Sequence, residues 1–255
     1  MRTLAFLLLL APILNAESLS VTPRALYVRV ALGIERTSDT TLGDRDCSST
    51  RPPALFGCVE GNDGRPLAAR GDFGDAPVVE AAIGFEREGR GPRVELALSH
   101  RAFELDASAN FPGVAGEQPV HGDAESTAAM VVLSLPIPPA ASRVQPFLTA
   151  GTGIARNAIG NIRYEFPGIA PNAATIIRGG ANYTFAWTAG AGATLRPSDR
   201  HSVDLTIRYT NLGELRTDAG AATIVRPTRE LTLDIAGTRA RLQSLGATLS
   251  LRWRL

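Results

Sequence analysis

The sequence predicts an all-β protein, an eight-stranded antiparallel up-and-down transmembrane β-barrel with long extracellular loops and short periplasmic turns. Three observations predict it: eight segments alternate apolar and polar residues, most of them are about ten to thirteen residues long, and their connections are long and short in turn. A strand places successive side chains on opposite faces, so a period of two indicates strands. A tilted strand needs about nine to eleven residues to cross a bilayer, more than the usual five or six of a globular strand.

The clearest pair of strands lies in residues 182–212, on either side of a Pro-Ser-Asp-Arg turn. One face of the first strand carries aromatic and small apolar residues, from Tyr183 to Leu195, while the other face carries mainly Thr and Gly. The second strand alternates from Val203 to Thr210 in the same way. We therefore expect apolar side chains to point outward to lipid and polar ones inward to the lumen of a barrel.

The remaining strands follow the same rule. They are expected at residues 24–36, 77–87, 93–105, 126–135, 144–156 and 246–255. Short turns at 88–92, 136–142 and 197–200 are assigned to the periplasmic end, and the long connections to the outside. The loops at 36–75 and 213–235 leave room for an extra hairpin, so ten strands remain an alternative.

Two local features refine this strand pattern. The alternation breaks between Leu242 and Leu245, which predicts a β-bulge in the last strand. Gly151 and Gly153 share the lumen parity of the fifth strand. Since glycine has no side chain, these two positions are expected to leave space in a crowded lumen.

Residues 1–16 are predicted to be a secretory signal peptide, and residues 17–255 the barrel domain. Arg2 supplies one positive charge, residues 4–13 form an apolar run, and Ala16 is a small residue suited to cleavage. A membrane-spanning helix needs about twenty apolar residues, so this run is too short to anchor the chain. We therefore expect the chain to be exported.

The charge balance gives no indication of nucleic acid as a partner. Without residues 1–16 the chain keeps 25 of its 26 basic residues against 25 acidic ones, a formal net charge of zero. Proteins that bind nucleic acid carry a basic excess or a basic patch. All the basic residues are Arg, whose planar guanidinium suits buried ion pairs with carboxylates.

The two cysteines, Cys47 and Cys58, lie close together in the first long loop. In an exported protein such a pair predicts a disulfide, which stabilises its own loop by about 3 kcal/mol. A metal site would need further Cys or His ligands nearby, and the loop supplies none. We expect no metal site and no cofactor.

Three stretches in the second half of the chain share a recognisable pattern: QPFLTAGTGIARN, FAWTAGAGATLRPSDRHSVDLTIRYTNLGEL and SLGATLSLRWRL. They resemble the fifth to eighth strands of the outer-membrane protein A-like and opacity-type surface antigens, a family of eight-stranded outer-membrane β-barrels. The most specific piece is the Arg-Tyr-Thr-Asn-Leu-Gly run at residues 208–213. The first half of the chain resembles the family only in its pattern.

The resemblance implies a place in the cell outer membrane of a Gram-negative bacterium and a structural or surface-antigen function, with loops for adhesion or recognition. The partners it implies are outer-membrane lipid and lipopolysaccharide, the barrel assembly machinery, and a host or matrix ligand at the loops. One departure concerns the last residue, Leu255, because such barrels usually end in Phe. Trp253 keeps an aromatic residue two places earlier.

Charged residues of both signs lie at the lumen-facing positions of the predicted strands. They are Arg29, Glu80, Glu95, Asp204, Arg208 and Arg252. An unpaired buried charge costs several kcal/mol, so these groups must pair, and an eight-stranded barrel is just wide enough for side chains to fill it. We expect a salt-bridged plug; the alternative is a porin-like path for ions or small solutes.

Four aromatic residues lie toward the strand ends at positions that face outward. They are Tyr183, Trp187, Tyr209 and Trp253. Such residues are enriched where a membrane meets water, because an amphipathic ring fits the headgroup level. We expect them to anchor the barrel at the two membrane interfaces.

Two further interpretations remain open. A lipid A-modifying enzyme would need Ser and His on one strand face, but Ser99 and His100 are adjacent, as are His201 and Ser202, so each pair points to opposite faces. His121 lies in a loop without a clear partner, and we expect no catalytic residue. A soluble lipocalin-like barrel would alternate equally well with its faces reversed.

Overall fold

The computed structural model describes residues 24–255 except 45, 88–90, 139–143, 197 and 199. The predicted signal peptide and parts of all three predicted short turns lie outside the described residues. No helix among the described residues is long and apolar enough to span a membrane.

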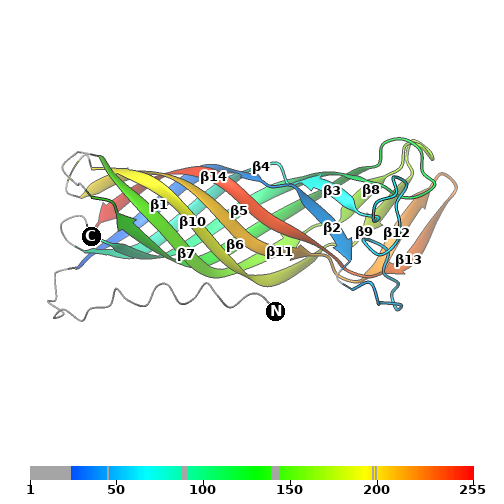
Figure 1. Cartoon of the computed structure of the whole chain (residues 1–255), viewed down its shortest axis with the longest axis horizontal. Coiled ribbons are helices and arrows are strands. Elements are labelled where there is room, and N and C mark those ends of the chain that lie inside the picture. The colour runs from blue at the N-terminus through cyan, green and yellow to red at the C-terminus, as the bar shows by residue number, and fades with distance from the viewer. Residues whose placement is uncertain (1–23, 45, 88–90, 139–143, 197, 199) are drawn as a thin grey trace.

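Eight long antiparallel strands form the wall of the molecule. They are β1 (Arg24–Thr37), β4 (Asp75–Arg87), β5 (Arg93–Ala109), β6 (Pro119–Pro136), β7 (Val144–Ile159), β10 (Gly180–Leu195), β11 (His201–Arg216) and β14 (Thr238–Arg254). Each pairs with the next, and β14 pairs with β1, with Leu32 opposite Leu249. The ring closes as an elongated cylinder (Figure 1), so the predicted eight-stranded barrel is confirmed.

Six short strands gather at the end of the cylinder opposite the C-terminus (Figure 1). They are β2 (Thr40–Asp44), β3 (Ala69–Asp72), β8 (Ile162–Glu165), β9 (Ala174–Ile177), β12 (Gly220–Arg226) and β13 (Arg229–Ile235). β2 and β3 form a hairpin that pairs with β14 on one side and β5 on the other. The extra strands thus lengthen the wall instead of widening the ring, so the ten-strand alternative is wrong.

The two faces of the wall exchange polarity part-way along several of the long strands, as β5 shows. Near its start, Val94, Leu96 and Leu98 are exposed on the outside while Arg93 and Glu95 are buried. Farther along, the outside carries His100, Glu104 and Asp106, and the inside carries Phe103 and Leu105. The alternation itself is unbroken, so the barrel has two segments with opposite polarity.

The segment nearer the C-terminus has an apolar outer belt. Residues 26–34 of β1 and 245–253 of β14 present their apolar side chains outward, nine residues in each strand. This matches the roughly nine to eleven residues that a tilted strand needs to cross a bilayer. Exposed Leu, Ile, Val and Phe side chains circle this segment.

The other segment, which we call the head, has an apolar core inside and a polar surface outside. Its core includes Leu42, Phe56, Leu67, Phe73, Phe103, Leu105, Val120, Ile162, Tyr164, Phe166, Ile177, Leu212, Leu215 and Leu242. The expectation of one polarity along each whole strand is therefore wrong in the head. Burying apolar side chains inward is favourable wherever the outer surface meets water.

The β-bulge lies on β11 and not on β14, so its predicted position is wrong. β14 pairs with β1 without a shift through Ser244 and Leu245. Between β11 and β14 the register shifts after Asn211, where β11 has one residue more than its partner, next to Gly213 with a positive φ of 80°. The sequence break between Leu242 and Leu245 marks the level where the two faces exchange polarity.

Gly151 lies on the inner side of β7, where the lumen is crowded. A Cβ atom placed there would lie 2.8 Å from Val132 Cγ2 and 3.2 Å from Thr188 Cγ2. Both neighbours come from adjacent strands and point inward. The glycine therefore gives the space that its place in the sequence predicts.

Candidate functional site

Ten charged side chains buried among the described residues fill the lumen behind the apolar belt. This lumen network consists of Arg29, Arg93, Arg101, Arg208, Arg252, Glu35, Glu80, Glu86, Glu95 and Asp204. Five positive and five negative groups give it a formal charge of zero. All ten point inward, because every second residue of each strand faces the lumen and these residues occupy those positions.

The middle of the network joins four strands. Arg29 on β1 forms ion pairs with Glu80 and Glu95, and Arg208 on β11 reaches Glu80 at 2.7 Å. The Tyr27 hydroxyl donates a hydrogen bond to Glu95 at 3.0 Å. Each carboxylate thus has more than one donor, which offsets the desolvation that burial imposes on a charge.

The level closest to the head contains the most deeply buried pair. Arg101 donates two hydrogen bonds to Glu35, at 2.7 and 3.0 Å, and the two side chains are 1% and 0% exposed. Glu35 also accepts a hydrogen bond from Ser244 at 2.8 Å. A guanidinium that meets both carboxylate oxygens fixes their relative geometry, so this pair locks β1 to β5 across the lumen.

The level closest to the C-terminus gathers the remaining charges. Asp204 lies 3.1 Å from Arg93 and 3.6 Å from Arg252, and Arg252 also reaches Glu86 at 3.2 Å. Glu86 pairs with two further arginines at the rim, Arg196 and Arg254. The Arg93 guanidinium lies 4.6 Å above the Phe147 ring, a cation–π distance.

Side chains leave little free volume between these levels. Two lumen cavities have volumes of about 30 and 10 Å³, the first bordered by Arg93 and Phe147 and the second by Arg101 and Met130. A water molecule needs roughly 10–15 Å³ of such volume. These spaces therefore hold a few waters at most.

All six charged residues singled out in the sequence belong to this network. Sequence reasoning missed four others, Glu35, Glu86, Arg93 and Arg101. Their lumen-facing positions in the alternating strands were the available signal. They lie toward the ends of the expected strands, however, where alternation defines the strand boundaries poorly.

The four outward aromatic residues fall into two groups. Tyr183, Trp187 and Tyr209 lie on β10 and β11 toward the head; Tyr183 is 74% exposed, and the rings of Trp187 and Tyr209 are 5.4 Å apart. Trp253 lies at the other end, opposite Val28 and His201 on the neighbouring strands. Their role as membrane-interface anchors remains a prediction.

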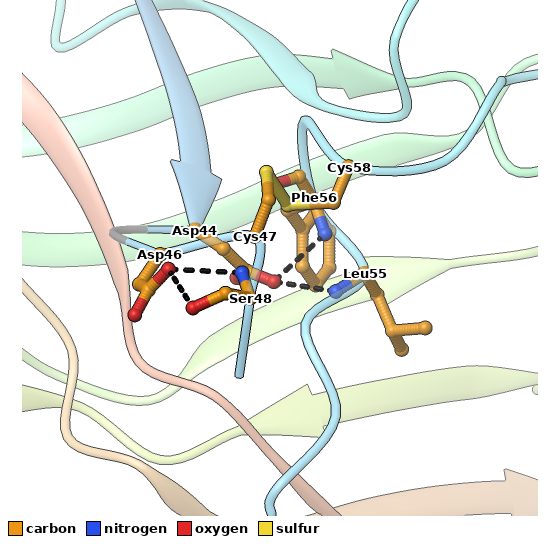
Figure 2. Close-up of a disulfide and its surroundings, with 7 residues drawn as sticks. All are labelled: Asp44, Asp46, Cys47, Ser48, Leu55, Phe56 and Cys58. Atoms are coloured by element: carbon orange, nitrogen blue, oxygen red, sulfur yellow. Dashed lines mark hydrogen bonds between the residues drawn. A yellow bond between two sulfur atoms is a disulfide. The ribbon is translucent and has the colours of Figure 1, made fainter. Parts of the chain in front are cut away.

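The disulfide loop closes the head. Cys47 and Cys58 are bonded, and between them the chain carries Phe56 into the core, where its ring lies 5.6 Å from Phe111 and 5.5 Å from Tyr164. Figure 2 shows the Asp44 carboxylate accepting hydrogen bonds from the amides of Leu55 and Phe56. A half-buried carboxylate and one aromatic ring thus hold the loop in place.

We predict that Asp44→Ala loosens this loop. It leaves the partly buried amides of Leu55 and Phe56 without the carboxylate that accepts from them, a cost of about 1–3 kcal/mol for each group left unsatisfied. Hydrogen exchange at these two amides should become faster. Asp46→Ala is the matched control, because among the described residues the exposed Asp46 side chain bonds only Ser48, within the same loop. Unchanged exchange in Asp44→Ala would contradict this anchoring role.

We also predict that the stability of this loop depends on pH through the carboxyl group of Asp44. Burial raises the pKa of the Asp44 carboxyl above its usual 3.8, against the lowering effect of the two amides. Because the pKa of this carboxyl is higher in the folded than in the unfolded state, the group stabilises the fold fully below its unfolded-state pKa. That stabilisation is lost as the pH rises through its folded-state pKa. The loop should therefore loosen on that rise, and Asp44→Asn should remove the dependence.

The histidines and serines do not assemble a catalytic set. Ser99 is buried while His100 is exposed and bonds Thr127 at 3.0 Å. Ser198 Oγ lies 3.0 Å from His201 Nδ1, but the same hydroxyl accepts the His201 backbone amide, as in a turn at the exposed rim. Within the described residues, no three His, Cys, Asp or Glu side chains are grouped to hold a metal.

Comparison with known proteins finds similar folds among solved structures. No family model and no curated protein matches the sequence. Among solved structures, the outer membrane protein OprG from Pseudomonas aeruginosa is similar with a TM-score of 0.54 and 10% identity, over 90% of this chain and 95% of that one. The outer membrane protease OmpT from Escherichia coli gives 0.52 and 10%, over 94% and 99%. The resemblance is confirmed at the level of the fold, and the chain has the fold of the outer-membrane β-barrels.

Proposed function

We propose that the chain is an integral protein of a Gram-negative outer membrane, exported by a cleaved signal peptide, that holds a recognition head outside the cell. In this proposal the belted segment spans the membrane with its C-terminal end in the periplasm. The head then serves adhesion to a host or matrix ligand, or acts as a surface antigen. The observation that carries it is the pairing of a filled lumen with a head built beyond the lipid-facing belt.

The filled lumen favours a mechanical function over a porin-like one. Balanced ion pairs join five strands of the wall, and the two cavities between these levels that described residues border have room only for isolated waters. A continuous water path is required for ion flow. We therefore expect no steady ohmic openings when the purified protein is added to planar bilayers.

The construction of the head favours recognition. Its loops are seated by an apolar core and a disulfide, so their backbones are held in place while their surfaces stay exposed. OmpT is a protease by its name, whereas the described histidines and serines of this chain do not assemble into a catalytic set. We propose no enzymatic activity, and unchanged lipid A in expressing cells would support that.

Two measurements on expressing cells test the proposal. The protein should fractionate with the outer membrane and migrate differently on a gel before and after boiling, as folded barrels do. Cells carrying it should adhere to immobilised matrix, and deletion of residues 48–57 should abolish adhesion while leaving the heat-dependent gel shift intact. Release in the periplasmic wash, or full adhesion after the deletion, would overturn it.

A further inference from the structure

The larger of the two lumen cavities lies between the middle level of the lumen network and the level closest to the C-terminus. Its volume is about 30 Å³. The charged side chains that line it are Arg29, Arg93, Arg208, Glu95 and Asp204, which together give a formal charge of plus one. A space that holds isolated waters also holds one small ion, and the sign of this lining favours an anion.

Three hydroxyl groups line the cavity without a hydrogen-bond partner among the described residues. Thr206 on β11 and Thr248 on β14 are directly opposite each other, and Ser250 follows Thr248 on the same face of β14. Side chains that are directly opposite on neighbouring strands leave the backbone about 5 Å apart. The three hydroxyls therefore form a group of donors on one side of the cavity.

The buried Arg208 guanidinium adds a charged donor to the same cavity. Its Nη2 atom forms an ion pair with Glu80 at 2.7 Å, whereas its Nε atom has no hydrogen-bond partner among the described residues. A buried N–H group that lacks an acceptor is costly, so buried donors are almost always satisfied. The cavity therefore calls for an occupant that accepts hydrogen bonds.

The lumen has a surplus of positive charge next to this cavity. Two rim arginines, Arg196 and Arg254, share the Glu86 carboxylate with Arg252, so one carboxylate faces three guanidinium groups. With the rim included, the described lumen holds seven arginines and five carboxylates. Uncompensated charge inside a protein is costly, and a bound anion would offset part of it, whereas a water molecule would not.

The two carboxylates of the cavity lining are already neutralised by their own partners. Asp204 lies 3.1 Å from Arg93 and 3.6 Å from Arg252. Glu95 accepts hydrogen bonds at 3.0 Å from both Arg29 and Tyr27. Their repulsion of an anion is therefore largely offset within the lining itself.

We infer that this cavity binds a single small monovalent anion of the size of chloride. The Arg208 Nε atom and the hydroxyls of Thr206, Thr248 and Ser250 are its donors. A polyatomic anion such as phosphate or sulfate is too large for the space. The bound anion completes the salt-bridged plug by supplying a negative charge that the chain itself does not provide. The inference concerns the lumen alone and is independent of the proposed recognition by the head.

Bromide is the probe for this site, because it has the charge of chloride, nearly its size and a usable anomalous signal. Crystals of the detergent-purified, folded barrel grown in sodium bromide should show an anomalous difference peak inside the cavity, within hydrogen-bond reach of Arg208 Nε. Absence of that peak would overturn the assignment. So would a peak found only beside the rim arginines, Arg196 and Arg254.

Chloride should also stabilise the barrel beyond its effect on ionic screening. Urea unfolding in lipid vesicles, followed by the gel shift, is compared in sodium chloride and in sodium gluconate at the same ionic strength. Gluconate is too large for the cavity, and an ion that binds only the folded state stabilises it increasingly as its concentration exceeds its Kd. The urea midpoint should rise with chloride more than with gluconate, and equal midpoints would contradict a bound anion.

Thr248→Val combined with Ser250→Ala removes two donors and no hydrogen bond between described residues. The chloride concentration that gives half of the stabilisation should rise about tenfold, and the bromide peak should weaken. Ser202→Ala is the matched control, because Ser202 is as buried in the lumen as Ser250 but does not line the cavity. An unchanged chloride dependence in the double variant would overturn the assignment. The gel shift shows whether the variant folds, and if it does not, the bromide peak of the wild-type protein decides.

Discussion

Arg101→Met is expected to lower the free energy of unfolding by about 3–5 kcal/mol, the typical cost of removing one partner from a buried ion pair. Glu35 would lose both hydrogen bonds from Arg101. It would keep Ser244 and, at 3.6 Å, Arg208. Unfolding by urea in lipid vesicles, followed by the gel shift, measures the loss.

Glu35→Gln combined with Arg101→Met should recover much of that stability. Both charges are gone, so no unpaired charge stays buried, and replacing a whole buried pair is often nearly neutral. The exposed pair of Arg156 and Glu125 supplies the control: Arg156→Met should cost at most about 1 kcal/mol. A double variant that loses as much as the sum of the two single variants would show that the pair is not coupled as its geometry indicates.

Leu96→Arg is expected to prevent stable insertion of the barrel. Leu96 is 57% exposed on the outer face of β5, inside the apolar belt. A charged side chain at the lipid face of a barrel costs about 2–4 kcal/mol at the bilayer midplane and little near the interfaces. The yield of folded protein in vesicles and its urea midpoint both report the effect.

Glu104→Arg is the matched control for that prediction. It lies on the same face of the same strand as Leu96, past the level where the faces exchange polarity. Both substitutions place Arg in an outward position, so they differ mainly in depth. If the two variants fold and unfold alike, the apolar belt is not in contact with lipid.

The alternation of residues was enough to predict the eight strands, their order and, in the belt, the direction of their side chains. It predicted the strand ends less well: β6 begins at Pro119, seven residues before its expected start at 126, and β5 continues to Ala109. The inward-facing positions of the strands carry apolar residues in the head, whereas they carry polar residues in the belt. A period of two looks the same in both segments, so it does not reveal which face meets water.

The parts that were missed depend on contacts between distant residues. The pairing of β2 with β14 joins residues that are about two hundred positions apart in the sequence, and no local pattern encodes it. Phe56 looked like an ordinary loop residue, yet it packs against Phe111 and Tyr164 in the head core. The lumen charges were easier to find, because a charge within an alternating strand is conspicuous by itself.

The central claim is that the apolar belt faces lipid while the head stands in water. Single cysteines at positions 96 and 104, in a chain that retains the disulfide, can each carry a fluorophore in reconstituted vesicles. Nitroxide-labelled lipid acyl chains should quench the label at 96 strongly and the label at 104 weakly, and a water-soluble quencher should give the opposite order. Strong aqueous quenching at 96 with no quenching by the lipid would contradict the account.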